Sequence, residues 1–232
     1  MFKTLLSCAT GASLALALAL NATAAADTAP KATDLLFEGK HIASIAPGTE
    51  LRYKFIRKPS DEQILGPGFT DDITVKVESE AAIAGKKNVL IQMYTGDRAK
   101  DPNRITDMDG NPMLVVYLDT ALGHFRLLAG GDPAYLKNKF SSSFAKEDVK
   151  VEPIKINYKG ADVDGYRVTV SPFSNDPARA KMRGFELSEF SIALSDKIPG
   201  HFALMIANYM NSQKGGPTLD ERMILDGVGA VK

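Results

Sequence analysis

The side chains that could do acid–base chemistry in this sequence are three histidines and a few acidic residues. The histidines are His41, His124 and His201. They are far apart in sequence, and no two have the four-residue spacing that places a pair of metal ligands on one helix face. We therefore interpret them as strand-surface residues, and the sequence predicts no metal site and no cofactor.

Four aspartates could in principle serve general acid–base catalysis, namely Asp71, Asp72, Asp162 and Asp164. Each adjoins a turn or a strand end, where solvated carboxylates are common. The segment 107–111 is similar to a calcium loop, but its glycine comes too early and no glutamate follows at the required distance. A hairpin turn is the better interpretation of that segment.

No nucleophile with a base partner can be identified in the sequence. The serines at 141–143 have no histidine that is held by a third group, and the sequence contains no G-x-S-x-G motif and no phosphate-binding loop motif. We assign no catalytic residue. An envelope hydrolase remains an alternative, and it requires that two or more candidate residues converge in one cleft. These candidates are His41, His124, His201, Asp71, Asp72 and Asp164.

The charge balance excludes several classes of partner. Lys and Arg total 28, Asp and Glu total 28, and the formal net charge is zero. Nucleic-acid binding needs a basic surplus, and docking on an anionic membrane surface needs a basic patch. Beyond the N-terminus there is no run of about 18 apolar residues, so the sequence predicts no integral membrane span.

The N-terminal residues 1–26 have the pattern of a cleaved signal peptide. Lys3 supplies the positive charge, Ala12–Leu20 the short apolar segment, and Ala24-x-Ala26 the small residues of a cleavage site. An N-terminal membrane anchor and a lipoprotein attachment site at Cys8 are the alternatives. The signal peptide predicts an exported, periplasmic protein.

Residues 27–34 are expected to form a mobile leader, and residues 35–232 a single β domain. Cys8 is the only cysteine, so the chain after residue 26 can form neither a disulfide nor a cysteine-based zinc site. Because eukaryotic secreted domains usually carry disulfides, the absence of cysteine favours a bacterial periplasm.

Most of the chain after residue 50 alternates apolar and polar residues, the period of half-buried strands. Short turns rich in Gly and Asn favour antiparallel pairing, and they occur at 84–86, 109–111, 159–160 and 198–200. The alternation predicts about ten strands, at 51–55, 73–77, 89–93, 113–118, 125–127, 154–158, 166–170, 190–194, 202–206 and 223–225.

One helix is predicted at 132–140, where Asp132 can cap, Pro133 suits the first turn, and Leu136 and Phe140 have the spacing of one helix face. That face is expected to pack on a sheet. A second short helix is expected at 177–183.

The fold class that follows is mainly β. We expect a curved antiparallel meander, a half-barrel or open barrel, with one central helix as a lid. Segments 113–118 and 202–206 are apolar on both faces and need shelter from water on each side. A sheet curved around an apolar space would provide that shelter, and a fully packed core without a cavity is the alternative.

If the space exists, methionine and aromatic side chains suit an adaptable lining for a lipid or other hydrophobic ligand. The candidate ligand-binding residues are Tyr53, Phe55, Met93, Tyr117, Phe190 and Met205.

Three segments carry a resemblance to known proteins: 128–140 (LAGGDPAYLKNKF), 171–177 (SPFSNDP) and 194–200 (LSDKIPG). With them, and with its order of signal peptide, meander and central helix, the chain resembles uncharacterised periplasmic β proteins of proteobacteria. Its architecture is similar to the LolA/LolB-like half-barrels. The resemblance implies an unclosed barrel that binds hydrophobic molecules, and it supplies no catalytic residue.

The function expected from these observations is that of a periplasmic, non-enzymatic protein that binds an apolar or amphipathic ligand or an envelope protein. One alternative is the envelope hydrolase. The other is a structural or assembly subunit of the envelope, which an exposed contiguous apolar patch would indicate.

Overall fold

A computed structural model describes residues 30–146 and 149–232. The expected signal peptide, residues 1–26, and the start of the expected leader lie outside the described residues. Helix α1 (Ala32–Leu36) follows, and both its first and its last residue are buried. Residues 32–34 of the expected leader therefore belong to a packed helix.

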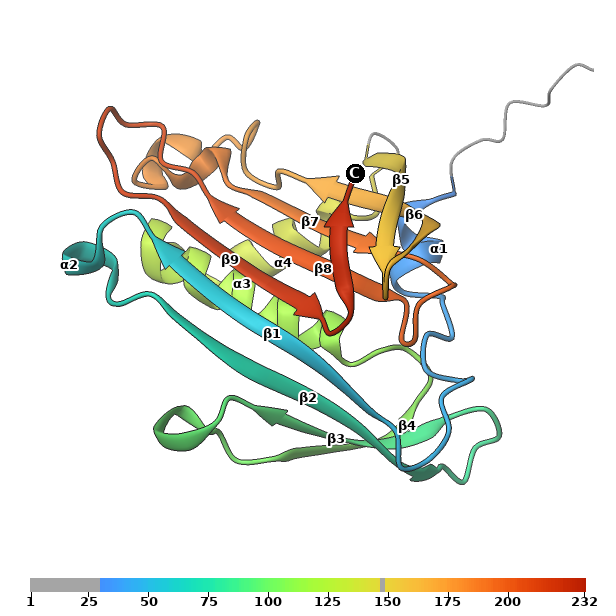
Figure 1. Ribbon diagram of the computed structural model, residues 1–232. Helices are drawn as coiled ribbons and strands as arrows, with labels where there is room; N and C mark the ends of the chain where they lie inside the picture. The colour runs from blue at the N-terminus through green and yellow to red at the C-terminus, as the bar shows by residue number, and fades with distance from the viewer. Residues whose placement is uncertain (1–29, 147–148) are drawn as a thin grey trace, which may run out of the picture.

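The body of the protein is one sheet of ten antiparallel strands in the order β10-β5-β6-β7-β8-β9-β1-β2-β3-β4 (Figure 1). This confirms the prediction of an open, curved antiparallel meander. The strands are β1 (Glu50–Pro59), β2 (Phe69–Glu80), β3 (Lys87–Met93), β4 (Asn103–Met108), β5 (Lys150–Tyr158), β6 (Ala161–Val170), β7 (Glu189–Leu194), β8 (Phe202–Tyr209), β9 (Leu219–Leu225) and β10 (Val228–Val231).

The curvature of the sheet follows from its connections. Only Asp226 and Gly227 join β9 to β10, yet four strands separate these two in the hydrogen-bonded order. The sheet must therefore coil until its β10 edge returns to the end of β9. Figure 1 shows β10 rising from that end toward β5, with which it pairs. Gly227 has a positive φ of 87°, a conformation that favours glycine in such a tight turn.

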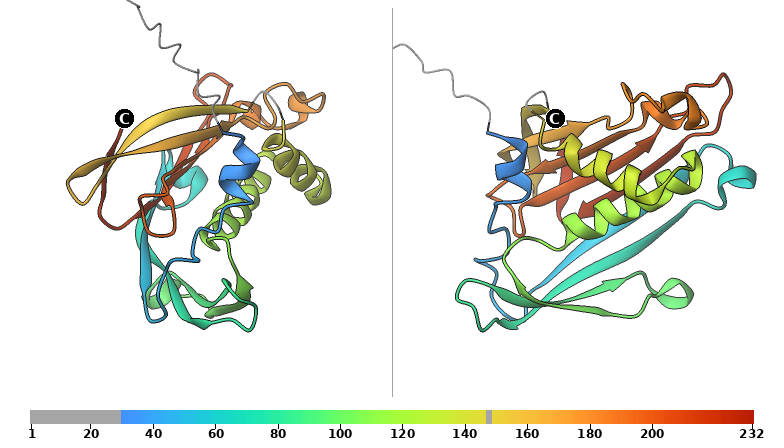
Figure 2. Two further views of the ribbon diagram at one scale, coloured as in Figure 1. Left: turned by 90° about the vertical axis from the view of Figure 1, so that its right-hand side faces the viewer. Right: turned by 180° about the vertical axis from the view of Figure 1, so that it is seen from behind.

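Two long helices, α3 (Met113–Ala129) and α4 (Pro133–Ser143), lie inside the curve of the sheet (Figure 2). The predicted helix at 132–140 is confirmed as α4, and the Asp132 side chain caps it by accepting the Tyr135 N–H at 2.8 Å. Its Leu136 and Phe140 are buried, and the Phe140 ring packs edge-on against Phe190 of β7 at 4.6 Å.

The strands predicted at 113–118 and 125–127 are wrong, because both segments belong to α3. An apolar run of six residues fits a buried strand and a buried helix equally well. The deciding signal lies in the longer window, where the buried residues Met113, Tyr117, Ala121 and Phe125 recur every four positions. The expected single lid is therefore two helices, and α3 is the longer one.

Two strands, β4 and β10, were not predicted from the sequence. Because they replace the two wrong strands, the total is still ten. Both are edge strands, whose polar and glycine-containing sequences show little alternation. The turn at 109–111 leads from β4 into α3 and not into another strand. The turns at 84–86, 159–160 and 198–200 do join neighbouring strands as predicted.

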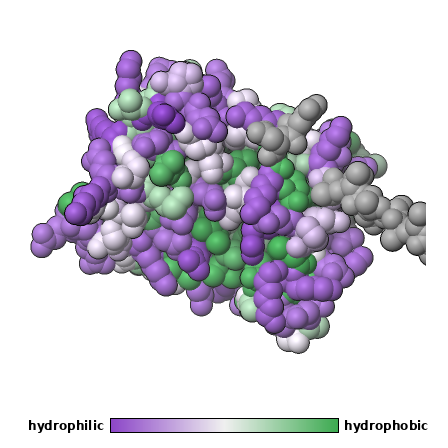
Figure 3. All heavy atoms as spheres, turned by 90° about the horizontal axis from the view of Figure 1, so that it is seen from above, coloured by the Kyte–Doolittle hydropathy of each residue, from purple (hydrophilic) through white to green (hydrophobic). Residues whose placement is uncertain are grey.

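The remaining helical elements are short: α2 (Glu62–Leu65) and the 3₁₀ turns η1 (Gly96–Arg98), η2 (Arg179–Lys181) and η3 (Phe185–Leu187). The helix expected at 177–183 is reduced to η2. On the side where β5 to β7 lie, hydrophobic residues remain visible between hydrophilic ones (Figure 3). Strand β8 is apolar on both faces as expected, with Met205 buried and Leu204 and Ile206 half-buried behind it.

Candidate functional site

A buried carboxylate lies on the concave face of the sheet. Glu221 of β9 is two residues from Leu219 and two from Met223, so it lies on the same face of the strand and points inward like them. It is only 3% exposed. Its Oε2 lies 2.7 Å from Nδ1 of His124 on α3 and accepts from the Tyr209 hydroxyl at 3.2 Å. A carboxylate in the core is stable only when charges and donors compensate it.

Arg57 of β1 supplies the compensating charge. Its Nε is 3.2 Å from Oε1 of Glu221, close enough for an ion pair although the angle does not meet hydrogen-bond geometry. The other nitrogens of the guanidinium donate to the carbonyls of Leu65 at 2.7 Å and Pro67 at 3.0 Å. Arg57 thus ties the α2 loop to Glu221.

His124 is the most exposed member of this cluster, and Arg57, whose side chain is 14% exposed, also borders the surface. Thr120, His124 and Leu127 follow one another along one flank of α3 at helical spacing. The Nδ1–H of His124 faces Glu221, which fixes the orientation of the ring. The side chain is 31% exposed, and Nε2 has no hydrogen-bond partner within residues 30–146 and 149–232.

The exposed side of His124 faces a cleft of about 540 Å³ between α3 and the β1–β3 part of the sheet. We call it the α3 cleft. Its lining includes Phe69, Met93, Tyr94, Lys100, His124 and Leu127. Its volume lies within the range of about 300–1,000 Å³ that is usual for small-molecule sites.

One wall of the α3 cleft is aromatic. The rings of Phe69 and Tyr94 lie 5.8 Å apart, and both contact the buried Phe55 behind them at 5.5 and 5.4 Å. Tyr94 has a φ of 63°, an unusual conformation for a bulky residue. Burial, with a smaller contribution from the charge of Glu221, raises the pKa of Tyr94 to about 12. The wall is therefore uncharged.

Only one predicted ligand-binding residue, Met93, lines this cleft. The other five are packed in the core beneath it. Phe55, Tyr117 and Met205 border a common void of only about 10 Å³, no larger than one water molecule needs. Helix α3 fills the space that the sequence had assigned to a ligand. The core-packed five are Tyr53, Phe55, Tyr117, Phe190 and Met205.

A second cleft, of about 730 Å³, lies between α1, β6 and the β7–β8 turn. We call it the α1 cleft. Its lining includes Leu35, His41, Asp164, Tyr166, Leu194 and His201. Three hydrolase candidates, His41, His201 and Asp164, therefore meet in one cleft, as that alternative requires.

Their geometry differs from that of an activated nucleophile. His41 is buried, its Nε2 donates to the carbonyl of Leu35 at 2.8 Å, and its Nδ1 accepts the Asn111 N–H at 3.3 Å. The ring of His201 packs edge-on against it at 5.1 Å. Asp164 is exposed and pairs with Lys155 at 2.6 Å. Burial lowers the pKa of both imidazoles, so they are neutral near pH 7.

The other candidate acids lie elsewhere. Asp71 is buried and accepts from Arg98 Nε at 2.9 Å, whereas Asp72 points outward to Arg52 at 3.3 Å. Asp162 is on the exposed β5–β6 hairpin, where it accepts from Asn157 at 2.8 Å.

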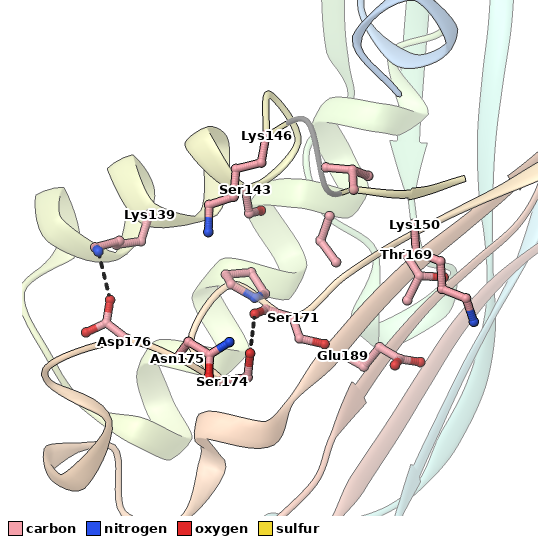
Figure 4. A pocket seen from close by; sticks show the side chains of 13 residues that line it. Lys139, Ser143, Lys146, Lys150, Thr169, Ser171, Ser174, Asn175, Asp176 and Glu189 are labelled. Carbon is pink, nitrogen blue, oxygen red and sulfur yellow. Dashed lines mark hydrogen bonds and ion pairs between the residues drawn. The ribbon is translucent and has the colours of Figure 1, made fainter. Parts of the chain in front are cut away.

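A third cavity, of about 290 Å³, is polar and lies between α4 and the loop after β6 (Figure 4). Lys139 reaches across to Asp176 at 3.0 Å. Burial alone would raise the pKa of Asp176, but hydrogen bonds from Tyr135 and Ala178 together with the Lys139 ammonium lower it overall. These partners are all internal, which makes the ion pair a tether between α4 and the loop.

The Glu221–His124 pair is what sequence reasoning missed. The two residues are 97 positions apart, and His124 was assigned to a strand. One signal was present, because Glu221 occupies an inward position in the alternating run 219–225. A charge at such a position is rarely buried unless it is paired.

Within the described ranges, no group of three or more His, Cys, Asp or Glu side chains could hold a metal ion. No helix in those same ranges combines the length and the apolar character that a membrane crossing needs. No protein-family model matches this chain, and no curated protein matches it.

Proposed function

We propose that this protein is a periplasmic, non-enzymatic binding protein that holds an amphipathic ligand in the α3 cleft. The observation that carries the proposal is the division of this cleft into an aromatic wall and a polar floor. Phe69 and Tyr94 stand on one side, and His124, held by the buried Glu221, stands on the other.

The apolar side of the cleft extends to its mouth. Leu127, on the last turn of α3, is 77% exposed and lines the cleft together with Met93. An exposed leucine next to a methionine and two aromatic rings is costly in water, and an apolar chain would cover them. Methionine adapts its shape to ligands that differ in length or branching.

The polar floor is organised before any ligand arrives. Glu221 fixes the His124 ring through Nδ1, and Arg57 compensates the buried charge. Burying these groups opposes folding unless the geometry is good. A polar cluster that ends at an open cleft is therefore better explained by ligand recognition than by stability.

The proposal is tested with the exposed apolar residues of α3. Leu127→Asp places a charge at the cleft mouth and should weaken the binding of a fluorescent fatty acid about tenfold or more. Val115→Asp is the matched control, because Val115 is on the same helix, 51% exposed, and outside the cleft. Native mass spectrometry of the purified protein should also detect a bound amphiphile. Equal binding by both variants and the wild type, or no binding at all, would refute the proposal.

A hydrolase in the α1 cleft is the second candidate, because His41, His201 and Asp164 line that one cleft. It predicts turnover of ester or amide substrates that is lost in His201→Gln. The same variant should leave fatty-acid binding in the α3 cleft unchanged, so the two candidates are separable.

A further inference from the structure

We propose that the α3 cleft selects amphiphiles with an anionic head group, which is held between Nε2 of His124 and the ammonium of Lys100. This inference rests on the function proposed above and names the ligand class. The same head-group chemistry occurs in free fatty acids and in single-chain anionic phospholipids.

The first support is the way His124 is held. Its Nδ1 is bound to Glu221 at 2.7 Å, so only Nε2 is available to a ligand. A protonated ring donates from Nε2 to an anionic oxygen. A neutral ring instead accepts from a protonated acid. In both arrangements one proton lies between Nε2 and the ligand oxygen, so a carboxyl group is satisfied in either state.

The second support comes from the cations around the cleft. Arg57 lines the cleft too, but it is paired with Glu221 and donates to three backbone carbonyls, and Arg98 is bound to Asp71 at 2.9 Å. Lys100 also lines the cleft, and it makes no ion pair among the described residues. Among the described residues, its ammonium is therefore the cation of the cleft lining that no carboxylate pairs.

The charges opposing an anion are fewer. Asp119 also lines the cleft and, like Lys100, is exposed to solvent, which screens both charges to a similar degree. Glu221 is compensated by Arg57. A cationic head group would meet the Lys100 ammonium, and an uncharged alcohol would leave that ammonium without a counter-charge.

The experiment compares ligands that share one chain and differ in the head. Hexadecanoate, hexadecanol and hexadecyltrimethylammonium compete with a fluorescent fatty acid for the wild-type protein. We expect the carboxylate to bind about tenfold more tightly than the alcohol, and the ammonium to bind most weakly. A single-chain phosphatidylglycerol in the same assay shows whether a free acid or a phospholipid fits better.

Two substitutions test the residues. His124→Gln and Lys100→Gln should each reduce the preference for the carboxylate over the alcohol several-fold while leaving alcohol binding near the wild-type value. His201→Gln, in the α1 cleft, is the matched control and should change nothing. Circular dichroism and the urea midpoint show that each variant is folded.

The outcomes separate the two proposals. Equal affinities for the three heads, tighter binding of the ammonium, or an unchanged preference in both Gln variants would overturn the inference while leaving amphiphile binding intact. If none of the three ligands binds, the proposed function itself fails.

Discussion

The α3 cleft and the α1 cleft each contain histidine, but they use it differently. In the α3 cleft, His124 is held by one nitrogen and presents the other to the open space. In the α1 cleft, both nitrogens of His41 are bound to the protein. The residue type is the same, and its neighbours decide its role. His41 holds α1 against the turn before α3, whereas His124 is available to a ligand.

The electrostatic design differs as well. The α3 cleft stands over a buried ion pair, Glu221 with Arg57, and burying this pair opposes folding. The α1 cleft keeps its imidazoles neutral by burial. We infer that the buried pair beneath the α3 cleft serves recognition at a cost in stability, and that His41 in the α1 cleft contributes to stability through its two hydrogen bonds.

The largest effect is expected from removal of the buried carboxylate. Glu221→Ala leaves Arg57 and His124 without their anion and should lower the free energy of unfolding by about 3–5 kcal/mol in urea denaturation. The matched control is Asp220→Asn, on the same strand but facing outward to Arg222 at 2.7 Å. Its loss should stay below about 1 kcal/mol. Equal losses of unfolding free energy in the two variants would show that the buried Glu221 contributes no more to stability than the outward-facing Asp220.

The next largest effect is the difference in stability loss between substitutions of His41 and of His124. His41→Ala leaves the Leu35 carbonyl and the Asn111 N–H without their partner and should cost about 3 kcal/mol. His124→Ala removes a half-exposed ring and should cost about 1 kcal/mol while reducing ligand binding. Unfolding curves and ligand titrations of both variants provide the measurement. The reverse ranking of stability losses would contradict the contrast between the clefts.

A pH dependence follows from the α1 cleft. Burial lowers the pKa of His41, although the Leu35 carbonyl and Asp109 act in the opposite direction. Burial and the neighbouring His41 lower that of His201, opposed by Asp196. Below the ordinary histidine pKa of 6.5 the unfolded chain binds more protons than the folded one, so stability should fall as the pH drops from 7 toward 5.

Each unit of pKa difference corresponds to about 1.4 kcal/mol. The double variant His41→Gln, His201→Gln should lose this slope between pH 7 and 5, as measured by urea midpoints. If the slope of stability against pH persists in the double variant, groups other than His41 and His201 cause it.

The smallest effect concerns the hydroxyl beside Glu221. Tyr209→Phe removes a group that lies 3.2 Å from Glu221 Oε2 and 3.1 Å from the Ala121 carbonyl, and it should cost about 1 kcal/mol. Tyr158→Phe is the control, because the Tyr158 hydroxyl has no hydrogen-bond partner among the described residues and its removal should be nearly neutral. If Tyr209→Phe is also neutral, His124 and Arg57 alone hold the carboxylate.

Local pattern was sufficient for much of the fold. Alternation identified β1 to β3 and β5 to β9, because a half-buried strand has to place every second side chain in the core. Asp132 and Pro133 located the start of α4, because capping acts within one turn of a helix. The same local reading assigned 113–118 to a strand, because six apolar residues carry no period of their own.

Composition, the open antiparallel class of the sheet and the helix at α4 could be determined from the sequence itself, since each depends on neighbouring residues. The residues that meet in the α3 and α1 clefts could not be determined from the sequence. Glu221 and His124 are 97 residues apart and meet only because β9 pairs with β1 and α3 lies inside the curve. His41 meets Asn111 across 70 residues in the same way. Tertiary structure alone decides which inward residues α3 covers and which border an open cleft, because that depends on how far the sheet coils around the helix.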